Sequence, residues 1–267
     1  MRATHVPEKG TILTEQWPAP EATRDGEFVV RVVAASVCGS DLHAVLHGTL
    51  HPLGPTRAGY PGHEGVGVVT ESRSRKFPVG TPVLCVPPGE MGGTFAQFML
   101  LDDDHAVALP GDVDPSDLTQ MRRYMMAQQM GTCLYAMDLY WPTEVPERHA
   151  GTCVIMGAGS AGLFFLQDAL RRGFEQVIVS DKQESRLRIA RELGAHTVRV
   201  PDEELASVAA RSEPGLVSFH KAVRRIHDGE VTVDYCLGPV YPFEEAGEVL
   251  RIVERGGDGH VKFTIVP

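Results

Sequence analysis

The sequence predicts an α/β protein with a β-rich first half and a second half built on a parallel sheet. Two observations carry this prediction. The first half is rich in glycine, proline and short β-branched runs separated by turn residues, a pattern typical of antiparallel strands. The second half alternates short apolar strands with helical segments, and strands in that order pair in parallel through right-handed crossovers.

The expected strands of the first half are three β-branched runs bounded by glycine and proline. They cover Phe28–Ala35, Val66–Thr70 and Val83–Val86. The residue pattern changes after Pro115, because Ser116–Tyr140 carries methionine, leucine and alanine at roughly helical spacing. Asp114-Pro115-Ser116 supplies a cap and an early proline, so a helical connector is expected there.

The second half begins with an apolar strand that runs into a glycine-rich turn. The expected elements are a strand over Cys153–Met156, a helix from the turn through Leu170, a strand over Val177–Ser180, a helix over Ser185–Leu193 and a strand over Thr197–Val200. This β-α-β-α-β order implies a three-stranded parallel sheet.

Composition narrows the class of protein. The chain has 267 residues, 43% hydrophobic and 22% charged, which fits a packed core of one large domain or two modest ones. A net charge of −10 argues against a nucleic acid or an anionic membrane as the main partner. No apolar run approaches the roughly eighteen residues of a membrane span, and Met1–Gly10 lacks the apolar core of a signal peptide. We therefore expect a cytoplasmic protein with its five scattered cysteines reduced.

The glycine-rich turn predicts a dinucleotide site. Gly157-Ala-Gly159-Ser160-Ala161-Gly162 lies between a strand and a helix, and Asp181 ends the next strand about 20 residues later. The phosphates would lie at the helix N-terminus, and Asp181 would accept hydrogen bonds from the ribose hydroxyls, which favours NAD over NADP. Lys182 and Arg186 lie near enough in sequence to offset part of the repulsion of a 2′-phosphate. The alternative is a βα turn that uses glycine only for packing.

A second group of residues offers the ligand types that zinc accepts. Cys38 follows the first strand, and His63 and Glu64 lie further along in Gly62-His-Glu-Gly-Val-Gly67. Thiolate, imidazole and carboxylate are zinc ligands, and a catalytic zinc needs three of them plus an open position. The alternative is a buried free cysteine and ordinary histidines.

Together these motifs resemble the zinc-dependent medium-chain alcohol and polyol dehydrogenases. The resemblance rests on Cys38-Gly-Ser-Asp-x-His43, on Gly62-His-Glu-x-x-Gly67 and on the Gly157–Gly162 fingerprint, with further similarity over Gly93–Phe98 and Val261–Ile265. It implies a GroES-like catalytic domain over residues 1–150, a Rossmann domain over 151–215, and a return to the catalytic domain over 216–267. The implied activity is reversible alcohol oxidation with zinc and a nicotinamide cofactor.

The resemblance also implies roles for individual residues. Cys38 and His63 resemble zinc ligands, and Glu64 resembles the adjacent carboxylate that ligates zinc or exchanges with water. Asp41 resembles the acid that orients the ligand histidine. Ser40 resembles the hydroxyl that takes the substrate proton, and His43 the relay to solvent. Three residues between the motifs could line the pocket or be solvated loop residues: His47, His51 and Tyr60.

Two departures from the family concern metals. The third zinc ligand, usually cysteine or glutamate, falls at Gln128, whose amide oxygen is a neutral and weaker donor. Cys133 is an alternative by chemistry, although it fits the register poorly. The four closely spaced cysteines of a structural zinc are missing, with only Cys85 in that region, so one zinc is expected.

The third departure is the length of the dinucleotide domain. Two or three strands expected after Thr197–Val200 are absent, and the chain passes through Ser212–Leu216 into Phe219–Ile226, which resembles the family's returning segment. Either a segment is left out of this chain or the chain is a shortened homologue. The first strand of such a half-sheet would expose an apolar edge.

The leading hypothesis is a zinc- and NAD-dependent oxidoreductase that oxidises a secondary alcohol of a polyol, sugar or amino-alcohol to a ketone. One rival is a redox-neutral lyase or epimerase on the same scaffold. Another is a non-catalytic zinc- or nucleotide-binding homologue. A homodimer or homotetramer is expected.

Overall fold

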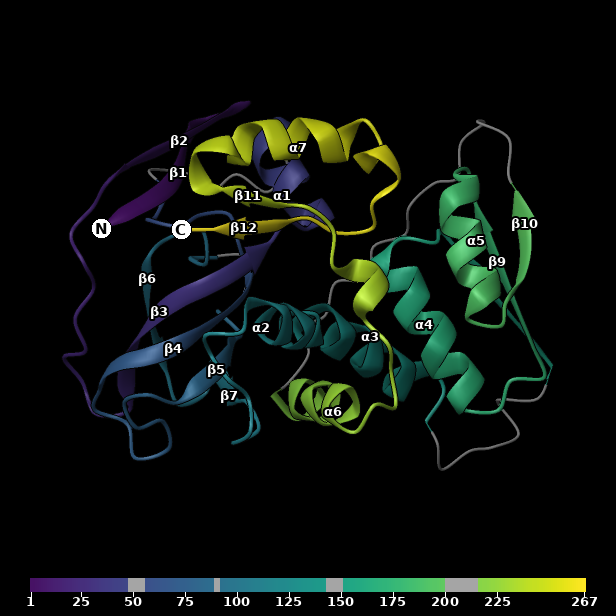
Figure 1. Ribbon diagram of the computed structural model, residues 1–267, viewed down its shortest axis with the longest axis horizontal. Coiled ribbons are helices and arrows are strands. Elements are labelled where there is room, and N and C mark those ends of the chain that lie inside the picture. Colours follow the sequence, from purple (N-terminus) through teal and green to yellow (C-terminus); the bar gives the residue numbers. More distant parts are fainter. Residues whose placement is uncertain (48–55, 89–91, 143–150, 200–215) are drawn as a thin grey trace. The chain divides into compact units, whose positions relative to one another are not determined.

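The computed structural model describes residues 1–47, 56–88, 92–142, 151–199 and 216–267, which belong to two compact units. The first unit comprises Met1–Gln128 and Cys236–Pro267, and the second comprises Gln129–Tyr235. The predicted α/β class is confirmed, with a β-rich unit and a short parallel sheet (Figure 1). The three-part domain division at 150/151 and 215/216 stays a prediction, and the compact units are bounded elsewhere.

The first unit is built on a seven-stranded sheet. Its order is β11-β12-β3-β4-β5-β7, with β6 also paired to β3. The strands are β3 (Glu27–Ser36), β4 (Glu64–Ser72), β5 (Pro82–Cys85), β6 (Phe98–Asp102), β7 (Ala106–Ala108), β11 (Val240–Pro242) and β12 (Thr264–Val266). β3 is the central strand, and its almost continuous burial explains why its sequence is a run of valine and alanine. All pairs are antiparallel except β11 with β12.

Other elements of this unit cover the sheet. β1 (Arg2–Glu8) and β2 (Thr11–Gln16) form a separate antiparallel hairpin. α7 (Ala246–Glu254) packs against β2, β11 and α1 (Gly39–Leu42), and buries Val249 and Leu250 in one of the unit's hydrophobic clusters (Figure 1). The chain enters β3 at a buried carboxylate, Glu27, which accepts hydrogen bonds from the backbone N–H groups of Arg24 and Thr23. These bonds lower the pKa of Glu27 to about 2.

The predicted helical connector is two helices. α2 covers Leu118–Met125 and α3 covers Ala127–Tyr140. The cap of α2 is Asp117, whose carboxylate accepts from the backbone N–H groups of Thr119 and Gln120, so the helix begins later than Asp114-Pro115-Ser116 suggested. No helix within the described ranges is both long enough and apolar enough to cross a membrane.

The second unit contains the parallel sheet. β8 (Thr152–Met156), β9 (Gln176–Asp181) and β10 (His196–Arg199) lie in the order β10-β9-β8. α4 (Ser160–Arg171) and α5 (Glu184–Glu192) connect them, and Val200 lies outside the described residues. β8 is an edge strand among the strands described. Its Val154 and Met156 are 63% and 64% exposed, which is the apolar edge that the sequence predicts.

A chain of charged side chains joins three helices of the second unit. α6 (Leu216–His227) supplies Lys221 and Arg225, α4 supplies Asp168 together with Arg172 at its end, and α3 supplies Asp138. Arg172 donates to Asp168 and to Asp138, each at 2.6 Å, and Arg225 also pairs with Asp168. Lys221 reaches Asp138 at 2.8 Å. The network links α6 to α3 and α4 within the second unit.

Candidate metal site and glycine-rich turn

Strand register places the candidate metal ligands next to one another. Ser36, the last residue of β3, lies opposite Glu64 on β4 and opposite Thr264 on β12. Cys38 lies two residues beyond that end of β3, and His63 lies immediately before β4. Segments distant in sequence therefore deliver a thiol, an imidazole and a carboxylate to one end of the central strand.

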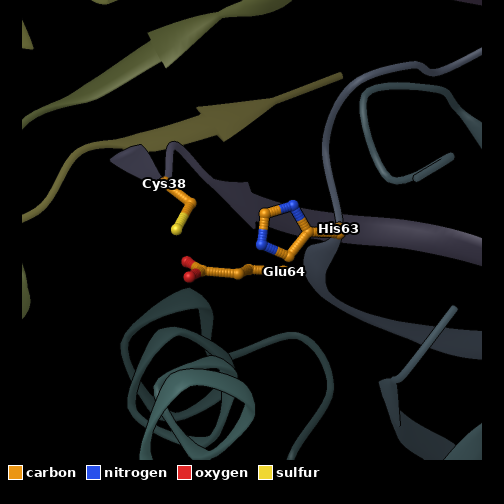
Figure 2. Close-up of side chains that lie close together, drawn as sticks. All are labelled: Cys38, His63 and Glu64. Atoms are coloured by element: carbon orange, nitrogen blue, oxygen red, sulfur yellow. The ribbon is translucent and has the colours of Figure 1, made fainter. Parts of the chain in front are cut away.

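Cys38, His63 and Glu64 form a cluster whose ligand atoms all lie within 4.8 Å of one another. Figure 2 shows the sulfur of Cys38 and the carboxylate of Glu64 facing each other, with the imidazole of His63 beside both. Glu64 is 1% exposed, whereas Cys38 and His63 are partly accessible. This donor set suits zinc, and the separations are short enough for one ion to contact all three residues.

Asp41 holds two members of this cluster in place. Its carboxylate accepts from the backbone N–H of Cys38 at 2.7 Å and lies 3.4 Å from Nδ1 of His63. Asp41 is buried in the short helix α1, which begins directly after Cys38. A carboxylate beside the far nitrogen of a ligand histidine fixes the ring and its tautomer, which is the role the resemblance implies for Asp41.

The carboxylate of Glu64 has two further partners that sequence reasoning missed. Lys262 Nζ lies 2.7 Å and 3.0 Å from the two carboxylate oxygens, and Ser36 donates its hydroxyl to the same carboxylate. Lys262 also donates to the carbonyl of Val37 at 3.1 Å. The only available signal was one lysine in the apolar run Val261–Ile265, since a buried lysine requires a partner.

The site perturbs its own ionisable groups. Burial opposes ionisation of Glu64, but the positive charges of Lys262 and His63 outweigh it and lower the pKa of the carboxyl. Burial also opposes protonation of His63, but the acceptors on Asp41 and Cys38 outweigh it and raise the pKa of the imidazole above its ordinary value. The site is therefore rich in charge before any ion enters it.

The predicted proton-relay residues lie in and just after α1. Ser40 is partly buried, and its hydroxyl has no hydrogen-bond partner in the part of the chain that the structure describes. His43 is exposed, and its ring lies 5.3 Å from that of His47, which is also exposed. Tyr60 is buried in the hydrophobic core, so the solvated-loop alternative is wrong for that residue, and His51 lies outside the described residues.

The third metal ligand stays a prediction. Gln128 is partly buried in the first turn of α3. Cys133 lies in the second unit, where its thiol contacts the carbonyl of Ala161 at 3.7 Å, and Cys85 is buried in the sheet of the first unit. Neither cysteine belongs to the cluster, and no second group of three clustered His, Cys, Asp or Glu ligands occurs among the described residues.

The glycine-rich turn of the second unit has the backbone that its motif predicts. Gly157 has φ +99°, a conformation that favours glycine, and its N–H donates to Ser180 at 2.7 Å. A Cβ on Gly162 would lie 1.9 Å from the carbonyl oxygen of Gly157, so helix and turn approach too closely for any other residue. A Cβ on Gly159 would meet open space, and the first residues of α4, Ser160 and Ala161, follow it. The helix N-terminus can therefore receive an anion.

Asp181 is already part of this turn. One carboxylate oxygen accepts from the N–H of Ala158 at 2.6 Å, and the other accepts from the N–H of Gln183 at 2.7 Å. A carboxylate accepts about four hydrogen bonds, so capacity for a ribose diol remains. Lys182 is exposed and Arg186 is partly buried. Their predicted contribution to cofactor selectivity stays a prediction.

Comparison with known proteins agrees with this architecture. Residues 24–111 match the family described as the alcohol dehydrogenase GroES-like domain. The crystal structure of galactitol-1-phosphate dehydrogenase from Escherichia coli is similar, with a TM-score of 0.78 and 17% identity over 100% of both chains, which shows the fold. The first unit thus contains a GroES-like domain, and the second contains a shortened Rossmann-type sheet.

Curated relatives extend the similarity beyond that domain. Scyllo-inosose 3-dehydrogenase of Thermotoga maritima is 27% identical in an alignment of length 240, which covers 72% of this chain and 58% of the relative. L-threonine 3-dehydrogenase of Bacillus subtilis is 27% identical in an alignment of length 234, which covers 77% of this chain and 63% of the relative. The chain thus spans about three fifths of the length of these relatives. The GroES-like domain and these relatives together support assignment to the medium-chain dehydrogenase/reductase family.

Proposed function

We propose that the protein is a zinc- and NAD-dependent dehydrogenase that oxidises a secondary alcohol of a polyol, sugar or amino-alcohol to a ketone. The observation that carries the proposal is the convergence of Cys38, His63 and Glu64 within 4.8 Å in a GroES-like domain. The substrate class is supported by the names of the two relatives, one acting on a cyclic polyol derivative and one on an amino-alcohol.

The residues present fit a zinc ion. Cys38 and His63 offer a thiolate and an imidazole, Glu64 adds a carboxylate, and Gln128 is the proposed weak further donor. When bound, the metal supplies Lewis acidity toward the substrate hydroxyl, and the nicotinamide supplies the hydride acceptor. Asp41 orients the ligand imidazole through Nδ1.

The chain's own residues also offer a path for the substrate proton. The Ser40 hydroxyl is buried and without a partner among the described residues, so it is available to take a proton from a bound alcohol. His43, three residues later and exposed, passes that proton to solvent. Replacing His43 with alanine is expected to slow oxidation mainly at neutral pH, with recovery as hydroxide substitutes, while zinc content is unchanged. An unaltered pH–rate profile would make His43 an ordinary surface residue.

The dinucleotide half of the proposal rests on the turn at Gly157–Gly162 and on Asp181. The turn leaves the N-terminus of α4 open to a pyrophosphate, and Asp181 lies beside it at the end of β9. A homodimer or homotetramer remains a further part of the proposal.

The direct test is zinc reconstitution followed by NAD reduction with a panel of polyols and amino-alcohols. One zinc per chain and alcohol-dependent NAD reduction are expected. Cys38→Ser should abolish metal binding and turnover together, and Gln128→Ala should weaken both only in part. Cys153→Ser is the matched control, because this partly buried thiol lies on β8, outside the cluster.

The same assay separates the rival functions. A redox-neutral enzyme would retain a nucleotide and convert substrate without net accumulation of reduced cofactor. A non-catalytic homologue would bind zinc or nucleotide and turn over nothing. Zero or two zincs per chain after reconstitution would contradict the proposed metal site.

A further inference from the structure

Lys262 is the most unusual side chain in the first unit outside the expected ligand set. It is 4% exposed, and its hydrogen-bond acceptors among the described residues lie at the candidate metal site: both oxygens of Glu64 and the carbonyl of Val37, the residue before Cys38. An ammonium is strongly hydrated in water, and burying it is costly unless it is paired and hydrogen-bonded. The structure therefore places a buried cation next to a site built to receive another cation.

A buried ion pair of this kind gives little net stability. The cost of removing both charges from water roughly cancels their attraction, and apolar residues of similar volume often serve as well. The pair between Lys262 and Glu64 is better explained by what it does to the carboxylate. Lys262 contacts both oxygens of Glu64, and Ser36 donates to one of them. Two side chains therefore hold the carboxylate of Glu64 while it faces Cys38 (Figure 2).

We propose that Lys262 is a positioning residue that competes with the bound metal for the carboxylate of Glu64. This inference rests on the proposed metal site. With Lys262 in place, Glu64 is neutralised by the ammonium and can turn to the metal only by loosening that pair. Lys262 thereby keeps Glu64 from being a permanent ligand and leaves a coordination position for substrate.

The proposed competition predicts an increase in zinc affinity when Lys262 is removed, which a merely structural role of Lys262 does not predict. If Lys262 is replaced by uncharged glutamine, Glu64 loses the ammonium that contacts both of its oxygens, and its carboxylate is freer to bind a divalent cation at the cluster. Zinc should then bind at least about tenfold more tightly, because a repelling charge is removed and a ligand is released. A lysine that only supports packing predicts unchanged or weaker zinc binding in the same variant.

The experiment measures zinc affinity by competition with a chromophoric chelator for wild type, Lys262→Gln and Lys262→Arg. Lys262→Arg is the matched control, because it keeps the charge and should stay close to wild type. The double variant Glu64→Gln with Lys262→Gln should lose the gain in affinity, since the released carboxylate is gone. Cobalt substitution gives an independent readout, because a carboxylate entering the coordination sphere changes the ligand-field bands in Lys262→Gln.

Each outcome decides the inference. Tighter zinc binding with altered cobalt bands in Lys262→Gln, both reversed by Glu64→Gln, would support it. Equal or weaker binding with unchanged bands would overturn it while leaving the dehydrogenase proposal intact. If wild type bound no zinc, the metal site and this inference would both fail. If Lys262→Gln is too unstable for titration, the zinc-induced rise in Tm is measured instead. A larger rise than in wild type would support the inference, and an equal or smaller rise would overturn it.

Discussion

Asp168 is the residue whose replacement should destabilise the second unit most. Its carboxylate is 2% exposed, and it receives Arg172 at 2.6 Å and Arg225 from α6. Asp168→Asn keeps the shape and removes the charge, so the guanidinium of Arg172, whose side chain is also 2% exposed, loses one of its two carboxylates. Removing one partner of a buried pair costs about 3–5 kcal/mol, and because Asp138 still pairs with Arg172, we expect about 3 kcal/mol.

Comparing the buried Asp168 pair with an exposed pair of the same network tests whether burial sets the size of the loss in stability. The outermost pair of the network joins Lys221 and Asp138, whose side chains are 49% and 34% exposed. An exposed pair contributes about 0.2–1 kcal/mol, so Lys221→Ala should cost less than about 1 kcal/mol. Replacing Asp168 and Arg172 together with leucine should recover part of the loss, because the two most buried charges are removed together. Asp138 keeps Lys221, and Arg225, which is 20% exposed, loses Asp168.

Urea denaturation followed by tryptophan fluorescence provides the assay. The two tryptophans lie in different units, and Trp141 contacts both the Phe174 ring and the network, through its carbonyl and Arg172. A Trp17→Phe background therefore leaves a single reporter in the second unit. An Asp168→Asn protein within about 1 kcal/mol of its parent, or a Lys221→Ala protein equally destabilised, would refute the reasoning.

Three further predictions concern pH, the glycine-rich turn and the cofactor. The pKa of Glu27 is about 2 instead of 4.5, so its contribution to stability is complete above pH 4.5 and is lost as the pH falls toward 2. Unfolding curves of Glu27→Gln and wild type, measured from pH 7 to 2, should converge at the acid end; a constant gap would contradict this assignment. Gly162→Ala should lower Tm and abolish NAD binding, because its Cβ would lie 1.9 Å from a carbonyl oxygen, whereas Gly159→Ala, which meets open space, should keep its Tm. Equal Tm values for the two alanine variants would show that the close approach is not limiting. Wild type should prefer NAD in kcat/KM, and Asp181→Ser should shrink or reverse the preference while also loosening the turn it braces. A wild-type preference for NADP would assign the selectivity to neighbouring cations.

The order of elements was predictable because each carries a local signal. The β-branched run that became β3 is buried almost throughout, and the strands and turn of the dinucleotide unit follow hydrophobic pattern and glycine spacing. The helical connector expected over Ser116–Tyr140 is present as two helices, and the first begins later than the expected cap. The side chain of Asp117 captures two backbone N–H groups, and a capping choice of this kind depends on local geometry more than on residue type.

The metal cluster was predictable from ligand type, but its surroundings were not. Cys38, His63 and Glu64 are residue types with a specific chemistry, so spacing and resemblance were enough to select them. Lys262 and Ser36 reach the site only through the pairing of β12 and β4 with β3, which places residues far apart in sequence on neighbouring strands. The polar network of α3, α4 and α6 is long-range in the same way, because it depends on which helix faces meet.

The distance along the chain between Glu64 and Lys262 has a consequence for how the proposed zinc site would be filled. The two residues are 198 positions apart, and at roughly 5–20 residues per second a ribosome needs roughly 10–40 s to pass from one to the other. During that interval the three ligands have been synthesised and their internal competitor has not. Zinc present during translation should therefore be incorporated more readily than zinc added to the finished protein, and equal zinc content in the two preparations would show that the timing of synthesis does not matter.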